Sequence, residues 1–290
     1  MTRHLAAIIV ACAFASACGS DGAGSSDSGG PTDGGSDSAA ESASGSDSGS
    51  DSAAGSDSAS DSGSDSGRDS ASDSGSISDG GCSNDGGGGY ATSFDLTENP
   101  ISECGHWPVQ GGLTGLDWTN VRTGGGLAFG TLTGLGGYED SIALLSGFAA
   151  NQRVTATVHF TSNRSAATGT HEVELILRGS YTAHVQHLYE CNLGYAGATG
   201  WYSQIVRMNG AIGDFTDITT SVSPLPDIKD GDVFTAEIVG SVISTYVNGV
   251  KTTTATDATH ATGQPGIGFF WRATEKIDDF AFTGLVATSL

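Results

Sequence analysis

The sequence predicts an all-β protein, an antiparallel two-sheet sandwich that follows a long disordered segment. Three observations predict this architecture. From residue 90 onward, β-branched and aromatic residues alternate with polar residues at a period of two. The alternating runs are short, are separated by Gly, Asn, Asp or Pro, and never show the period of a helix. Residues 90–290 are enough for one all-β domain with a well-buried core.

The chain begins with a segment typical of a secretory signal. A short basic head precedes an apolar run over residues 5–17, which is too short to span a bilayer. The run ends in Ala-Ser-Ala-Cys, which resembles a bacterial lipobox, although that pattern prefers Leu at the position of Ala15. We therefore expect residues 1–17 to be a lipoprotein signal peptide and Cys18 to be lipidated. An ordinary signal peptide is the alternative.

Residues 18–89 have the composition of a disordered linker. After Cys18 this segment has no aromatic residue, and Ile77 is its one bulky aliphatic side chain. It carries 13 Asp and one Glu against the single Arg68, a net charge of −13. Such a segment buries too little apolar surface to offset the entropy of ordering it, and its charges repel one another. We expect an extended linker that holds the domain away from a membrane, on an outer membrane or cell surface.

The domain itself is acidic, because residues 90–290 contain 19 acidic and 9 basic side chains, a net charge of −10. This charge disfavours binding to nucleic acid and electrostatic attachment to anionic lipid. We therefore expect no nucleic-acid partner, and membrane attachment through the lipid anchor only.

Three cysteines lie beyond the lipobox, and an oxidising compartment permits one disulfide among them. A bond between Cys104 and Cys191 would close a long loop within the domain. A bond between Cys82 and Cys104 would instead tie the linker to it. We name Cys104 with Cys191 as the candidate pair, but the spacing does not choose between the two.

The strands are predicted in chain order from their alternation. Residues 153–160 (RVTATVHF) place four apolar side chains on one face. Residues 172–178 (EVELILR) bury three aliphatic side chains and turn Glu172, Glu174 and Arg178 the other way. The alternation continues, less cleanly at first, through TAHVQHLYECNLGY, YSQIVRMNG and VFTAEIVGSVISTYVNGV.

The last third of the chain predicts a hairpin and two closing strands. Asn248-Gly249 separates VISTYV from VKTTTAT, and this dipeptide favours a two-residue turn because both residues need positive φ. Pro265-Gly266 then opens the strand IGFFW, whose glycines allow a backbone or ligand to approach closely. The final strand, KIDDFAFTGLVA, should pair near the first, YATSFDLTENP.

This series resembles the laminin-G-like, concanavalin A-like family of jelly-roll sandwiches over roughly residues 90–288. The resembling stretches are DVFTAEIVGSVISTYVNGV, GQPGIGFF and IDDFAF. The resemblance implies a jelly-roll sandwich, which hosts lectins, glucanases, lyases and adhesive modules, and it therefore leaves the activity open.

Enzymes of this fold, by resemblance, place catalytic groups on one concave sheet. Retaining glucanases use a strand motif Glu-x-Asp-x-x-Glu, because acid and nucleophile must lie close together. HEVELILR supplies Glu172 and Glu174 on one face, but Leu177 stands where the third carboxylate belongs. Related lyases use a Gln-Ile-His strand, and YSQIVR has Val206 in place of the histidine. Both templates are thus incomplete.

The polar face of this sheet favours an ordinary solvated surface, with a sugar-binding groove and then an enzyme site as the alternatives. Glu172, Glu174 and His184 would be its catalytic groups if the protein is an enzyme. The predicted ligand-binding residues are Glu172, Glu174, Arg178, His184, Gln186, Gln204 and Trp118, with Glu190, Asn192 and His159 on or beside the same face.

Tryptophans would stack on sugar rings. Trp107 and Trp118 lie in Gly-rich context and are candidates for the rim of the site, but packing is the favoured role for these two and for Trp201 and Trp271.

The resemblance also implies a structural calcium ion. Asp278 or Asp279 beside Asp95 or Glu98 would supply oxygen ligands where the terminal strands meet. A surface acidic cluster without an ion is the alternative, and no other cofactor is expected.

The sequence thus favours a surface-anchored carbohydrate-binding or adhesive module whose partner is a glycan or a surface protein. The alternative is a glycan-cleaving enzyme, either a glycoside hydrolase or a polysaccharide lyase. A purely structural surface component is a third hypothesis.

Overall fold

The computed structural model describes residues 88–132, 139–161, 170–197, 200–272 and 280–290. These residues form two eight-stranded sheets, and every strand pair but one is antiparallel, which confirms the predicted two-sheet sandwich. The described ranges contain 3-10 structure at η1 (Glu103–Gly105) and at Gly197, and no helix long and apolar enough to cross a bilayer. The signal peptide, Cys18 and nearly all of the linker lie outside these ranges and stay predictions.

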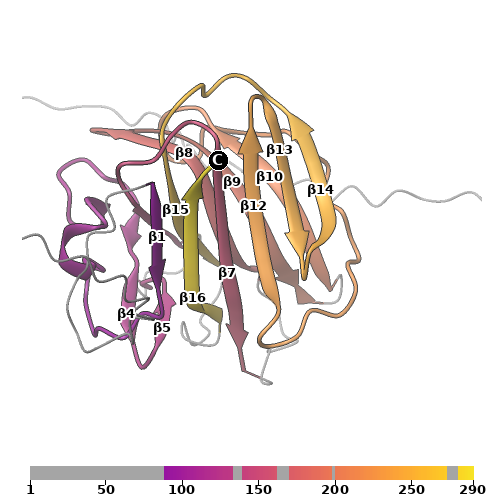
Figure 1. Cartoon of the computed structure of the whole chain (residues 1–290), viewed down its shortest axis with the longest axis horizontal. Coiled ribbons are helices and arrows are strands. Elements are labelled where there is room, and N and C mark those ends of the chain that lie inside the picture. The colour runs from indigo at the N-terminus through magenta and orange to yellow at the C-terminus, as the bar shows by residue number, and fades with distance from the viewer. Residues whose placement is uncertain (1–87, 133–138, 162–169, 198–199, 273–279) are drawn as a thin grey trace, which may run out of the picture. The chain divides into compact units, whose positions relative to one another are not determined.

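The first sheet, sheet A, lies in front in Figure 1. Its strand order is β14 (Val250–Thr256), β13 (Val242–Val247), β12 (Val233–Val239), β7 (Gln152–Phe160), β16 (Phe280–Ser289), β5 (Leu127–Phe129) and β4 (Arg122–Gly124), and β1 (Gly89–Thr92) also pairs with β16.

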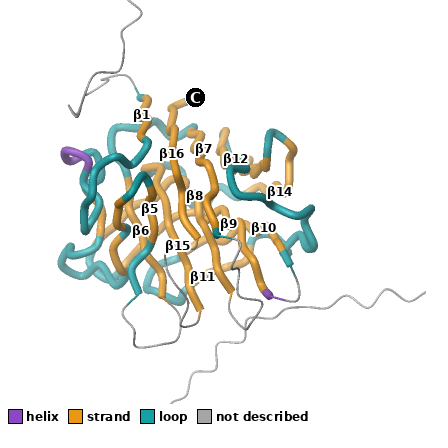
Figure 2. The backbone as a smooth tube through the Cα atoms, turned by 90° about the horizontal axis from the view of Figure 1, so that it is seen from below, coloured by secondary structure: helices purple, strands orange, loops and turns teal. Residues whose placement is uncertain are grey.

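The second sheet, sheet B, lies behind sheet A in that view. Its strand order is β11 (Phe215–Asp217), β10 (Trp201–Met208), β9 (Val185–Ala196), β8 (Thr170–Thr182), β15 (Gln264–Arg272), β6 (Glu139–Leu144) and β2 (Val109–Gln110), and β3 (Thr119–Asn120) pairs in parallel with β6. The chain passes between the sheets from β6 to β7 to β8 and again from β14 to β15 to β16, as in a jelly roll. Strands and loops make up nearly all of the backbone in Figure 2.

The period-two alternation places side chains as predicted. On β7, Val154 and Val158 are fully buried while Arg153 is exposed. On β8, Val173 and Leu175 are fully buried in the space between the sheets. Because one face of each strand is buried, a slip of one residue would expose the whole apolar set, and the register is therefore strongly specified.

Both predicted closing features are present. Asn248 and Gly249 connect β13 to β14 with φ values of 50° and 77°, as a two-residue turn with positive φ requires. The first and last strands pair, with Tyr90 opposite Ala287.

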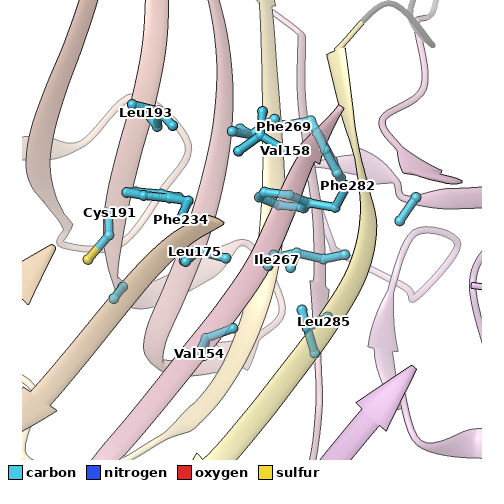
Figure 3. Close-up of a cluster of buried hydrophobic side chains, with 14 of the residues drawn as sticks. Val154, Val158, Leu175, Cys191, Leu193, Phe234, Ile267, Phe269, Phe282 and Leu285 are labelled. Carbon is cyan, nitrogen blue, oxygen red and sulfur yellow. The ribbon is translucent and has the colours of Figure 1, made fainter. Parts of the chain in front are cut away.

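The core lies between the sheets, where side chains from both interdigitate (Figure 3). Phe269 of sheet B meets Phe282 of sheet A with ring centroids 5.4 Å apart. Phe234 of β12 lies near Leu175 and Cys191 of the opposite sheet. The aromatic and aliphatic residues of the predicted strands therefore form one continuous apolar layer.

The structure corrects the candidate disulfide. Cys191 is a free thiol, fully buried on β9, where burial raises its pKa above the usual range for cysteine. Cys104 is disulfide-bonded, but not to Cys191, and its partner therefore lies outside the described residues. Alternation on β9 turns Cys191 into the core with Tyr189 and Leu193, which leaves it no route to a loop cysteine.

Candidate functional site

The outer face of sheet B, turned away from sheet A, gathers four carboxyl groups. Glu172 and Glu174 lie two residues apart on β8 and therefore share this face. Glu190 of β9 pairs with Ile176, one step further along β8, and Asp140 of β6 lies in the same cross-strand row as Glu172. We call Asp140, Glu172, Glu174 and Glu190 the carboxyl cluster.

Amide and phenol groups lie among these carboxyls. Asn192 pairs with Glu174 across the strands, and its Nδ2 donates to Glu172 Oε2 at 3.5 Å. The Tyr202 hydroxyl donates to Glu172 Oε1. Gln204 lies in the same row as Asn192 and Glu174, and its Oε1 accepts from the Ser221 hydroxyl at 3.0 Å. The face thus carries both acceptors and donors.

Two glycines provide the space in which these side chains lie. A Cβ at Gly268 would lie 2.2 Å from Glu174 Oε2, which means that the Glu174 carboxyl extends over strand β15. A Cβ at Gly194 would lie 2.3 Å from the Tyr202 ring. The sequence predicts that glycines of IGFFW permit close approach, and at Gly268 the approaching group is the protein's own carboxyl.

Burial and mutual repulsion raise the pKa of every carboxyl in the cluster. Burial raises the pKa of Asp140 to about 7, with a contribution from the charge of Glu172. Burial likewise raises the pKa of Glu172 to about 7, against the Tyr202 hydrogen bond, which lowers it. Burial, and then the neighbouring carboxylates, hold the pKa values of Glu174 and Glu190 well above their usual range. Within the described residues, none of the four forms an ion pair.

Such an arrangement supports proton transfer as well as hydrogen bonding. Carboxyls that remain protonated near neutral pH donate hydrogen bonds and act as general acids. The glucanase-like motif on β8 lacks its third carboxyl, since Leu177 faces the core and Ile176 takes the outer face. Glu190, opposite Ile176, supplies a carboxyl there from the neighbouring strand. Its alternation with Asn192 marks it in the sequence, but only the β8–β9 register places it beside Glu174.

The other half of the outer face is apolar. Ile142, Ile176, Leu188 and Met208 form a second hydrophobic cluster with Trp118, which is only 4% exposed. The prediction of Trp118 as a rim residue is therefore wrong, because the apolar half of the sheet provides a surface on which its ring packs.

The remaining tryptophans are also buried. Trp107 is fully buried and its Nε1 donates to Glu103 Oε2 at 2.9 Å, which confirms the favoured packing role and rejects the rim. Trp201 and Trp271 are 3% and 2% exposed and belong to the main core. Stacking of a sugar on an exposed indole is thus not available at any of the four tryptophans.

Three further predicted ligand residues lie away from the carboxyl cluster. A β-bulge between Leu177 and Ser180 breaks the alternation, and Arg178, with φ of 51°, points its guanidinium at backbone carbonyls of three loops. His184 lies in the exposed turn after β8, where its Nδ1 is 2.9 Å from Asp117 Oδ1. Gln186 is buried on β9 beyond Leu188. His159, on β7, belongs to sheet A and is 2.9 Å from Asp230.

The described residues contain no arrangement of oxygen ligands that supports the calcium hypothesis. Asp95 is exposed and accepts from the Ser93 hydroxyl at 3.0 Å, while Glu98 accepts from two backbone N–H groups at the start of η1. Asp278 and Asp279 lie outside the described ranges. Across those ranges, no group of three or more His, Cys, Asp or Glu is placed to hold a metal. Calcium stays a prediction.

Replacing Gly194 with alanine tests the packing of this face. The new Cβ would overlap the Tyr202 ring, which must move and give up its hydrogen bond to Glu172. We expect the free energy of unfolding to fall by about 1–3 kcal/mol in urea denaturation. Gly124→Ala on β4 is the control, because nothing lies within 3.8 Å of its Cβ position. Equal stability of the two variants would contradict the described position of Tyr202.

No protein-family model matches this sequence, and a search of curated proteins finds no relative of it. Solved structures of similar fold include the carbohydrate-binding module CBM66 from Bacillus subtilis, at 15% identity over 56% of this chain and 83% of that chain, with a TM-score of 0.37. A κ-carrageenase from Zobellia galactanivorans matches at 11% identity over 69% and 92% of the two chains, with a TM-score of 0.42. The β-agarase A complex with oligoagarose matches at 12% identity over 69% and 90%, with a TM-score of 0.43. These similarities concern the fold alone.

Proposed function

We propose that this protein binds a glycan on the outer face of sheet B, with the carboxyl cluster, Asn192, Tyr202 and Gln204 as its polar contacts. The observation that supports it is the alignment of these groups in three neighbouring cross-strand rows. Sugar hydroxyl groups both donate and accept hydrogen bonds, and carboxyl, amide and phenol side chains complement them.

The charge of the face selects among glycans. A sulfate or uronate group near these four carboxyls would meet no basic partner of theirs among the described residues and would oppose their ionisation further, so the face disfavours sulfated or uronic-acid polymers. We therefore propose that the ligand is an uncharged or cationic glycan.

Binding of the full chain to a panel of polysaccharides tests this proposal. We expect retention by neutral β-glucans or galactomannans and none by carrageenan or alginate. Asn192→Ala should weaken binding by about tenfold, because an amide that contacts a sugar contributes on the order of 1–1.5 kcal/mol. Glu237→Gln, on the outer face of sheet A, serves as the matched control. Binding that prefers anionic polymers, or that Asn192→Ala leaves intact, would refute the proposal.

One observation favours a second candidate function, glycoside hydrolysis. Glu174 and Glu190 lie diagonally across two strands, and burial and their neighbours raise the pKa of both. One would protonate the glycosidic oxygen while the other activates water or attacks the anomeric carbon. Release of new reducing ends during the binding assay, abolished in Glu174→Gln, would support this function, and unchanged oligosaccharide length would exclude it.

A further inference from the structure

Among the described residues, no basic side chain forms an ion pair with the carboxyl cluster. Two arginines on the strands of this sheet, Arg178 of β8 and Arg207 of β10, contact other groups. The Arg178 guanidinium donates to the carbonyls of Ala150, Gly240 and His260. Arg207 pairs with Asp257 at 2.5 Å. Buried carboxyls in proteins are ordinarily paired or hydrogen-bonded, because burying their charge alone is costly.

A separate observation shows which kind of group would complement the cluster. Asn192 is 3% exposed, and its Nδ2 donates to Glu172, which directs the amide into the cluster. Its Oδ1 is buried and accepts no hydrogen bond from the described residues, and the same holds for Glu174 Oε2. Asn192 Oδ1 can only accept, and Glu174 Oε2 accepts once its carboxyl is ionised. The group that fits between them is therefore a donor, and the surrounding carboxyls favour a positively charged one.

We infer that the glycan held on this face carries primary amino groups, and that the ammonium of an amino sugar binds between Asn192, Glu174 and Glu190. This inference rests on the proposed glycan-binding function and specifies its ligand class. An ammonium has three N–H donors and no acceptor, so it satisfies Asn192 Oδ1 and Glu174 Oε2 together. It also brings a positive charge to carboxyls that form no ion pair with any described residue.

Binding of a cation has a consequence for protons. The ammonium favours the ionised form of each carboxyl that it contacts, and carboxyls that are protonated in the free protein must then release protons. The titratable groups that face this position are Asp140 of β6, Glu172 and Glu174 of β8, Glu190 of β9, Tyr202 of β10 and Asp217 of β11. A neutral sugar of the same shape would release few or none.

Two oligosaccharides that differ only in acetylation test the inference. We would titrate the full chain at pH 6.5 with a β-1,4-linked glucosamine tetramer and with its fully N-acetylated counterpart, by calorimetry in two buffers of different ionisation enthalpy. We expect the amine form to bind about tenfold more tightly, as a charge-assisted hydrogen bond in place of a neutral one would give. Only its binding heat should differ between the buffers, because only it releases protons.

Variants distinguish binding at the carboxyl cluster from a general electrostatic attraction between an acidic protein and a cationic sugar. Glu174→Gln and Glu190→Gln should each reduce the preference for the amine form to near unity, and circular dichroism would confirm that they fold. Glu237→Gln removes a carboxyl from the other sheet and should leave the preference unchanged. Equal or tighter binding of the acetylated tetramer would overturn the inference while leaving the proposed function intact. Binding of neither tetramer, with no binding in the polysaccharide panel, would overturn both.

Discussion

Replacing Arg178 with methionine should lower the free energy of unfolding by about 3 kcal/mol or more. The side chain is 4% exposed, and its guanidinium donates to the carbonyls of Ala150, His260 and Gly240 at 2.7–2.9 Å. These carbonyls belong to three different loops. Methionine has a similar length but no donor, so the carbonyls of three loops would lose this partner. Equilibrium unfolding in urea, followed by the fluorescence of the four buried tryptophans, measures the change.

Arg153→Met is the matched control. Arg153 pairs instead with an acidic residue, Glu237 at 2.7 Å, and its side chain is half exposed on sheet A. Exposed pairs contribute about 0–1 kcal/mol. If Arg178→Met lowers the free energy of unfolding by no more than Arg153→Met does, other contacts hold the three loops together. Gly263 allows its loop to pass close to the backbone of Arg178, since a Cβ there would lie 2.2 Å from the Arg178 carbonyl oxygen.

The second large effect is a loss of stability as the pH rises. Folding raises the pKa of Asp140 and Glu172 to about 7 and those of Glu174 and Glu190 well above their usual range. Between pH 6.5 and 8.5 the folded state therefore binds more protons than the unfolded state, and its stability falls as these protons leave. Allowing for the partial exposure of Asp140 and Glu172, we expect a loss of about 2 kcal/mol, or roughly 5 °C in Tm.

The chosen pH window separates the carboxyl cluster from the titrations of His260 and Asp257. Burial lowers the pKa of His260, so the contribution of His260 to the free energy of unfolding changes with pH below pH 6.5. The pKa of Asp257 is lowered to about 2, although burial opposes this, and its contribution is lost only in strong acid. Glu174→Gln should reduce the pH dependence and raise Tm at pH 8.5, whereas Glu237→Gln should change neither. Thermal unfolding curves that are independent of pH across this window would mean that the cluster is solvated and ionised.

Much of the sandwich follows from local pattern. Alternation on β7 and β8 fixes which side chains face the core, and the Asn248-Gly249 dipeptide fixes the turn between β13 and β14. Glu172 and Glu174 share the outer face for the same reason. These features depend on neighbouring residues along one strand, and a sequence displays them directly.

The same rule fails where the backbone departs from regular pleating. Arg178 would share the face of Glu174 on an unbroken strand, but the bulge after Leu177 redirects it to the loops. Gly179 within that stretch is the local signal of a bulge, but the alternation of the preceding residues places Arg178 with Glu174. Burial of Trp118 depends on the apolar half of sheet B, which strands far apart in the sequence build together.

By itself the sequence determined an antiparallel all-β sandwich, the core-facing residues of its longer strands, and one acidic face on β8. Contacts between strands were needed to place Glu190 and Asp140 beside Glu172 and Glu174. They were also needed to show that Arg178 and His184 lie elsewhere. The free thiol of Cys191 likewise follows from its place in the core. The physical reason is that alternation is a property of a single strand. Register between strands and the path of loops depend instead on contacts between residues far apart in the chain.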